Sequence, residues 1–188
     1  MFPLRHLASR SLPLRQAKFF SPGATTLENE QGFKIQRKKG ATGTYTEIGT
    51  NDDNDTTYTD GDTALVDGTQ YYYKVYAYNT SGNSPFSNEV NGFTALAKPT
   101  NATATARSSS RIDLTWNDNS AAETGYKIER KKTIDGTYSQ ITQVGANVES
   151  YSDTSGLESN TTYYYRIRAT NAALNSDYSN EPHAKTLR

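Results

Sequence analysis

The sequence contains no cysteine, which excludes disulfides, thiolate zinc sites and cysteine nucleophiles. It also lacks any run approaching the roughly 18 apolar residues that a membrane-spanning helix needs. Histidine is scarce, and neither His6 nor His183 lies in a recognisable catalytic motif. No serine occupies a nucleophile elbow. We therefore expect a protein that is not an enzyme, needs no cofactor and does not insert into a membrane.

What the sequence does contain is a long internal repeat. Residues 32–48 (GFKIQRKKGATGTYTEI) recur as residues 125–141 (GYKIERKKTIDGTYSQI). Farther on, residues 69–79 (TQYYYKVYAYN) recur as residues 161–171 (TTYYYRIRATN). A repeat unit of about 90 residues is far longer than one turn of a solenoid, so each copy should be a whole small domain.

The repeat and the charge distribution together divide the chain into three parts. Residues 1–25 carry four basic residues and no acidic one, and we predict an unstructured or ill-fitting segment there. The two copies predict domains at 26–98 and 99–188. Because the chain is neutral overall, the two domains together are net acidic, which gives no electrostatic footprint for nucleic acid.

The second copy predicts an all-β domain. In residues 111–116 the apolar residues alternate with polar ones, which places Ile112, Leu114 and Trp116 on one face of a strand. Residues 162–170 alternate in the same way over the longest run. Seven short strands separated by turn signals indicate a sandwich of two antiparallel sheets. Tyrosine, with 14 residues, can supply much of the core.

Trp116, Tyr126, Leu157, Thr161 and Tyr163 make the second copy resemble the fibronectin type III domain. The resemblance implies an immunoglobulin-like β-sandwich with a tyrosine corner, in which the buried Tyr163 hydroxyl bonds to nearby backbone. It is nearest to versions found in bacterial extracellular and surface proteins. It therefore implies a spacer and interaction module, outside the cell or at its surface, joined to other domains of a larger parent protein.

The first copy matches the second only from about Glu28 onward. Leu65 and Tyr71 stand where Leu157 and Tyr163 stand in the second copy. Nothing upstream replaces the alternating strand that ends in Trp116. We therefore expect tandem domains of which the first lacks its first two strands. Its open edge would accept strands from another chain, which predicts self-association as one alternative function.

The exposed face of the longest strand in the first copy is the candidate binding site. Tyr72, Lys74, Tyr76 and Tyr78 alternate with inward residues and should share that face. Aromatic rings with polar neighbours can stack on sugars or anchor a protein, so a dedicated carbohydrate-binding module is a second alternative. The simpler interpretation is that cross-strand side chains cover one another and stabilise the sheet.

An acidic loop in the first copy partly matches a calcium-binding pattern. Asn51, Asp53 and Asp55 occupy positions 1, 3 and 5, and Asp62 occupies position 12. Thr56 replaces the glycine of position 6, and aspartate replaces the bidentate glutamate of position 12. We favour a solvated hairpin loop and predict no metal site.

Two pairs of neighbouring carboxylates, Glu28 with Glu30 and Asp60 with Asp62, fall in predicted turns. Paired carboxylates serve as acid and base in glycoside hydrolysis when a cleft holds them. In turns we expect them to be solvated and without a catalytic role.

Overall fold

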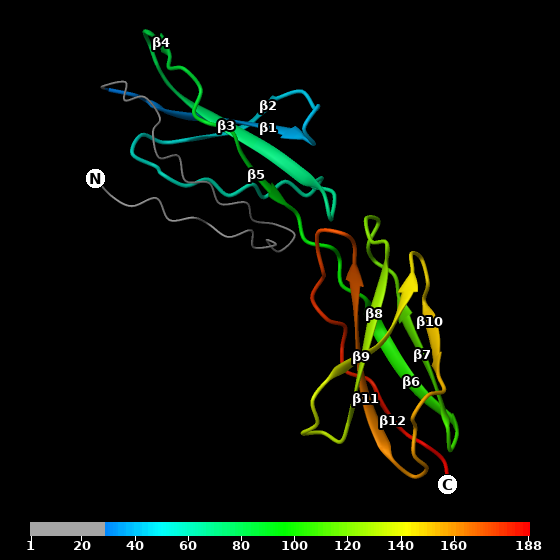
Figure 1. The fold of residues 1–188 in the computed structure, drawn as a ribbon. Helices are drawn as coiled ribbons and strands as arrows, with labels where there is room; N and C mark the ends of the chain where they lie inside the picture. The colour runs from blue at the N-terminus through cyan, green and yellow to red at the C-terminus, as the bar shows by residue number, and fades with distance from the viewer. Residues whose placement is uncertain (1–28) are drawn as a thin grey trace. The chain divides into compact units, whose positions relative to one another are not determined.

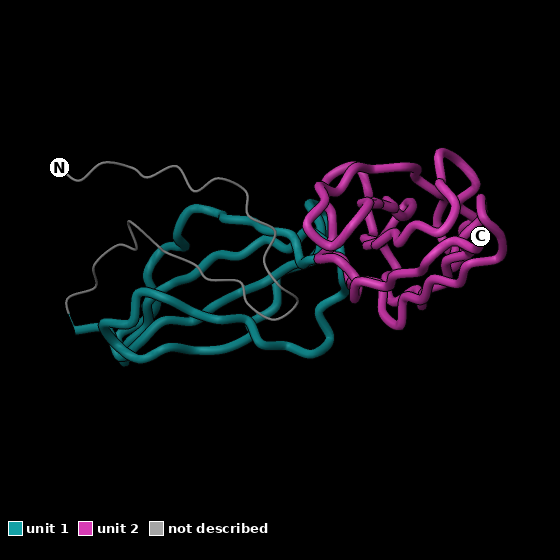
Figure 2. The backbone as a smooth tube through the Cα atoms, turned by 90° about the horizontal axis from the view of Figure 1, so that it is seen from below, with its two compact units in different colours: residues 1–95 teal, residues 96–188 magenta. Residues whose placement is uncertain are grey.

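The structure is a computed structural model that describes residues 29–188, so the prediction for residues 1–25 lies outside the described residues. The chain divides into unit 1, ending at Ala95, and unit 2, beginning at Leu96 (Figure 2). All regular elements from residue 29 onward are β-strands, joined in antiparallel pairs (Figure 1). Among these residues no helix is long and apolar enough to span a bilayer.

Unit 2 is a sandwich of two antiparallel sheets, as the strand pattern predicted. One sheet has the order β10-β7-β6, and the other has the order β12-β11-β8-β9 (Figure 1). The strands are β6 (Thr100–Ser108), β7 (Arg111–Asn117), β8 (Gly125–Lys132), β9 (Ser139–Gly145), β10 (Ser150–Asp153), β11 (Thr162–Thr170) and β12 (His183–Lys185).

The core of unit 2 lies between these sheets. From β7, Ile112, Leu114 and Trp116 point inward and are at most 3% exposed. The four-stranded sheet contributes further aliphatic side chains and buried tyrosine rings, each removing apolar surface from water. Leu96, which falls in the predicted first domain (26–98), is 2% exposed and packs into this core. The unit therefore begins at least three residues before Pro99.

Unit 1 shows one five-stranded sheet in its described residues. Four strands have the order β2-β1-β3-β4, and β5 also pairs with β3. The strands are β1 (Gly32–Lys39), β2 (Thr46–Asn51), β3 (Gln70–Asn79), β4 (Gly82–Asn83) and β5 (Val90–Phe93). This sheet repeats the β9-β8-β11 arrangement of unit 2, since β1 pairs with β3 as β8 pairs with β11.

The inner face of the unit 1 sheet carries a small core. Its buried members are Ile35, Leu65, Tyr71 and Tyr73. Within residues 29–95 no strands correspond to β6 and β7 of unit 2. The expected loss of two strands concerns the chain upstream of Glu28, which lies outside the described residues.

Candidate interaction surface

A buried ion pair fixes the inner side of unit 2. Arg130 lies on β8 two residues after the inward-facing Ile128, so its side chain enters the same side of the sheet. Its Nη1 donates to Asp153 Oδ2 at 2.7 Å, and the Tyr165 hydroxyl donates to the same oxygen at 2.9 Å. Burial, reinforced by the charge of Asp153, raises the pKa of Tyr165. The tyrosine therefore stays a hydrogen-bond donor at any physiological pH.

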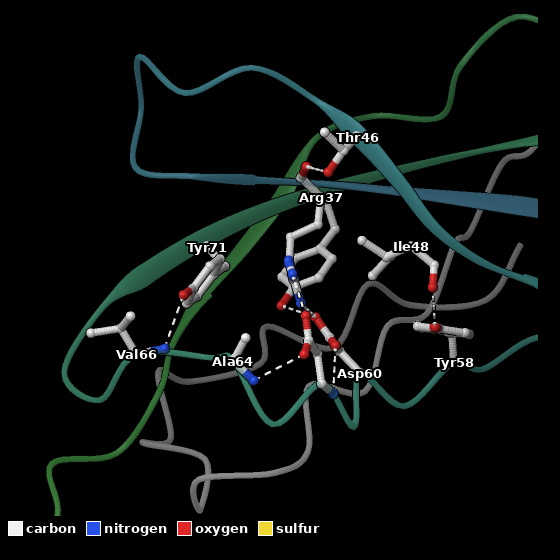
Figure 3. A network of polar contacts seen from close by, with 10 residues as sticks. Arg37, Thr46, Ile48, Tyr58, Asp60, Ala64, Val66 and Tyr71 are labelled. Atoms are coloured by element: carbon white, nitrogen blue, oxygen red, sulfur yellow. Dashed lines mark hydrogen bonds and ion pairs between the residues drawn. The ribbon is translucent and has the colours of Figure 1, made fainter.

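Unit 1 repeats this arrangement and corrects one prediction. Arg37 Nη1 donates to Asp60 Oδ2 at 2.7 Å (Figure 3). The Tyr73 hydroxyl donates to the same oxygen at 3.0 Å. Asp60, expected to be solvated, is only 2% exposed. A buried carboxylate is tolerated when its charge is paired and its oxygens accept hydrogen bonds. Asp62 is exposed as expected, but it accepts from Arg37 Nη2 at 2.8 Å.

Both units contain the tyrosine corner that the family resemblance implied. The Tyr71 hydroxyl accepts from the Val66 amide at 3.0 Å (Figure 3). The Tyr163 hydroxyl accepts from the Glu158 amide at 2.9 Å. In unit 1 the Arg37 guanidinium lies 5.3 Å from the centroid of the Tyr71 ring. The corner and the buried ion pair are therefore one connected structure, and both are polar anchors of the fold.

The candidate face on β3 is covered more than the sequence suggested. Tyr72, Lys74, Tyr76 and Tyr78 do share one side of the strand, but all four are half-buried. Cross-strand neighbours contribute to this cover. Lys34 of β1, for example, lies 5.5 Å from the centroid of the Tyr78 ring.

Two lysines lie among the aromatic rings of this face. Lys74 Nζ is 3.6 Å from the Phe86 ring centroid and 4.2 Å from that of Tyr45. Lys38 Nζ is 4.9 Å from the centroids of both Tyr45 and Tyr72. Ammonium groups are attracted to the faces of such rings, so these contacts connect β1 and β3 with the loops that carry Tyr45 and Phe86.

Glu89 lies at one end of this series of alternating cations and rings, which we call the ladder. Glu89 accepts a hydrogen bond from the Tyr45 hydroxyl at 2.5 Å and pairs with Lys38 Nζ at 2.9 Å. The hydrogen bond from Tyr45, followed by that from Lys38, lowers the pKa of Glu89 below its ordinary value. Glu89 therefore stays ionised at neutral pH and neutralises Lys38.

Phe86 is the apolar side chain that this face presents to solvent. It packs edge-on against Tyr76 with ring centroids 5.1 Å apart, yet it remains 49% exposed. It follows β4 in the chain and was not among the residues that the sequence singled out. An exposed ring beside a cation is the part of the face that is free to contact a partner.

Unit 2 carries a similar ladder of cations and rings, but this one has a buried glutamate at its centre. Arg166 lies 4.1 Å from the Tyr138 ring centroid and 3.8 Å from that of Tyr178. In its centre Glu129, 7% exposed, accepts from Arg166 Nε and from the Tyr178 hydroxyl, each at 2.8 Å. Burial alone would raise the pKa of Glu129, but these hydrogen bonds outweigh it and lower the pKa.

The calcium candidates do not converge. Asn51 donates through Nδ2 to the Thr57 carbonyl at 2.6 Å, and Asp62 is held by Arg37. Asp53 and Asp55 are exposed. Within the described part of the chain no three His, Cys, Asp or Glu side chains form a group suited to a metal ion.

The buried ion pairs could have been found from the sequence. Arg37 and Arg130 stand at inward-facing positions of their strands, where a charge needs a partner. Asp60 and Asp153 are the matching acids, since both copies contain them at the repeat offset. No sequence signal indicated that Phe86 is exposed beside Lys74, because the residue at the same position of the second copy is the polar Tyr178.

Comparison with known proteins agrees with this fold. Residues 97–185 match the family model described as fibronectin type III domain. Mouse Contactin-5 is 33% identical over 127 residues, which are 64% of this chain but 12% of that protein, so the chain spans a small part of this relative. A two-domain fibronectin type III segment of chicken tenascin aligns with a TM-score of 0.64 at 13% identity, over 92% of this chain and 99% of the segment.

Proposed function

We propose that this chain, whose residues 97–185 match the fibronectin type III domain model, is a non-catalytic spacer and interaction segment of a larger extracellular or cell-surface protein. The length of Contactin-5, of which the matching part is 12%, supports a role as part of a multidomain parent. Its partners in the same chain are then the neighbouring domains.

The observation that carries the interaction role is the outer face of unit 1. There an exposed Phe86 adjoins Lys74 and Tyr76 on a sheet whose backbone is rigidly paired. Aromatic anchors beside a cation are typical of the residues that dominate binding energy at interfaces. We propose that this face contacts a protein or a glycan.

A panel of immobilised glycans and matrix proteins tests this role with the full chain. We expect at least one component of the panel to retain the chain, and Tyr76→Ala to weaken that retention. Tyr164→Ala is the matched control, because Tyr164 lies on the corresponding face of unit 2. Retention by a glycan, lost with Tyr76→Ala, would establish the carbohydrate-binding alternative. No retention at all would leave the spacer role alone.

One observation favours self-association as a second candidate function. In residues 29–95 a single sheet carries a cluster of four buried side chains, whereas unit 2 builds its core from two sheets. We propose that unit 1 accepts strands from another chain over the inner face of its sheet. Sedimentation of the full chain over a concentration series should then show dimers or larger species. A monomer at every concentration would eliminate this candidate.

A further inference from the structure

The two outer faces differ at one matched pair of positions. In unit 2, Glu129 lies opposite Arg166 in the register of β8 and β11. In unit 1 the corresponding pair is Gln36 opposite Lys74, so a neutral amide replaces the carboxylate. Both pairs occupy the centre of the cation and ring ladder.

Unit 2 fills this centre with its own acid. Glu129 accepts hydrogen bonds from Arg166 Nε at 2.8 Å and from the Tyr178 hydroxyl, and it forms an ion pair with Arg166 Nη2 at 2.6 Å. Arg168 Nη2 adds a contact at 3.5 Å. The outer face of unit 2 is therefore a carboxylate-binding site that its own Glu129 occupies.

Unit 1 lacks that internal acid. Two of the three lysines on its face are neutralised, since Lys34 pairs with Glu47 at 3.5 Å and Lys38 pairs with Glu89. Lys74 makes no ion pair with any carboxylate of residues 29–188. Phe86 stands in the place of Tyr178, so this ring offers no hydroxyl and is 49% exposed.

We propose that the outer face of unit 1 binds a single glutamate or aspartate carboxylate from an otherwise apolar segment of a partner protein. Lys74 pairs with the carboxylate, and Phe86 packs against the neighbouring apolar side chain. The proposal rests on the interaction role proposed above and names the partner's chemistry. A sulfated polysaccharide fits less well, because Glu47 and Glu89 lie on the same face as Lys74 and would repel a polyanion.

The strength of the contact follows from its exposure. A single solvent-accessible ion pair contributes little, so an isolated short peptide should bind with a Kd on the order of 1 mM. In a full partner the packing of Phe86 would add to it. Magnetic resonance titration measures affinities in this range and locates the contact.

The test titrates the isotope-labelled full chain with a short, terminally blocked peptide that contains one glutamate flanked by leucines. We expect backbone shifts centred on Gln36, Lys74 and Phe86. The same peptide with glutamine in place of glutamate should bind at least about fivefold more weakly. A sulfated oligosaccharide is the second probe, and its preference over the glutamate peptide would overturn the proposal.

The sharpest variant is Gln36→Glu, which supplies the carboxylate from within, as Glu129 does in unit 2. It should weaken peptide binding about tenfold, the equivalent of one charge-assisted hydrogen bond. Gln143→Glu is the matched control, since it makes the same chemical change at an exposed position of unit 2 and should leave binding unchanged. Lys74→Met, which keeps the apolar stem, should weaken binding as much as Gln36→Glu.

Several outcomes would contradict the proposal. These are the absence of any shift with the peptide, equal binding of the glutamine peptide, and binding to Gln36→Glu as tight as to the unchanged chain. The spectrum of each variant shows independently whether unit 1 has folded. The two proposals can fail separately. If the peptide does not bind but the panel retains the chain and Tyr76→Ala weakens that retention, the interaction role is supported and the carboxylate proposal is wrong.

Discussion

Arg130 and Asp153 form an ion pair of 2.7 Å whose carboxylate is 1% exposed, and Arg37 and Asp60 repeat it in unit 1 at the same distance. Arg130 Nη1 also donates to the Ser155 carbonyl at 2.8 Å. The guanidinium thus ties β8 to the segment that follows β10. Neither pair is a surface salt bridge, because each carboxylate also accepts a hydrogen bond from a buried tyrosine hydroxyl.

Removal of the acid from this pair should destabilise unit 2 strongly. Asp153→Ala leaves the Arg130 charge without its partner, which we expect to lower the free energy of unfolding by about 3–5 kcal/mol. Urea denaturation of the full chain, followed by Trp116 fluorescence, measures this because Trp116 is the only tryptophan. Glu158→Ala, which breaks the exposed pair with Lys132, should cost far less. Equal losses would contradict the account.

The tyrosine corner should contribute through one hydrogen bond. Tyr163→Phe keeps the buried ring but leaves the Glu158 amide without its acceptor, and we expect a loss of about 1–3 kcal/mol. Tyr164→Phe, on the outer face, should change stability by less than about 0.5 kcal/mol. The same denaturation measurement compares them. A loss for Tyr164→Phe as large as that for Tyr163→Phe would show that the corner has no special role.

The core between the sheets of unit 2 should be sensitive to cavities. Leu114 is fully buried, so Leu114→Ala should lower the free energy of unfolding by about 2–5 kcal/mol. Ile134→Ala removes a comparable aliphatic side chain that is 57% exposed and should have little effect. Both are measured by thermal and urea unfolding. Similar costs for the two would mean that the sandwich is not packed as described.

The stability of unit 2 should fall in acid through Glu129. Its pKa in the folded protein lies below its ordinary value of 4.5, so the unfolded state binds the proton more readily. The contribution is therefore complete above about pH 4.5 and is lost as the pH falls through the folded-state pKa. The stability difference between wild type and Glu129→Gln should shrink as the pH falls. A difference that is constant, or that grows in acid, would contradict this assignment.

Much of the fold could be predicted because periodicity and repetition report it directly. The alternation of Ile112, Leu114 and Trp116 places β7 in the core, and the corner positions of Tyr71 and Tyr163 follow from the family pattern. Leu96 was misplaced since a single apolar residue in a short segment carries no period. Only the packing of unit 2 shows that it belongs to the core.

The sequence predicted where the candidate face lies, but it did not predict how far the side chains of that face are covered. Alternation put Tyr72, Lys74, Tyr76 and Tyr78 on one side of β3, which is correct. Exposure depends on the partners across the sheet, and these come from distant segments. Tyr45 and Phe86 lie in loops, where no pattern indicates which side chains fold back over the strands. Asp60 was mistaken for a solvated carboxylate although the sequence held a signal, the inward-facing position of Arg37, which lies 23 residues away.

We propose that unit 1 contacts its partner through the outer face that contains Phe86. The most direct test measures the affinity of the full chain for a panel component that retains it, before and after Phe86→Ala. Ile134→Ala in unit 2 is the control, since that side chain is similarly exposed. We predict binding about tenfold or more weaker for Phe86→Ala and unchanged for Ile134→Ala. Unchanged binding after Phe86→Ala, or an equal loss in both variants, would contradict the claim.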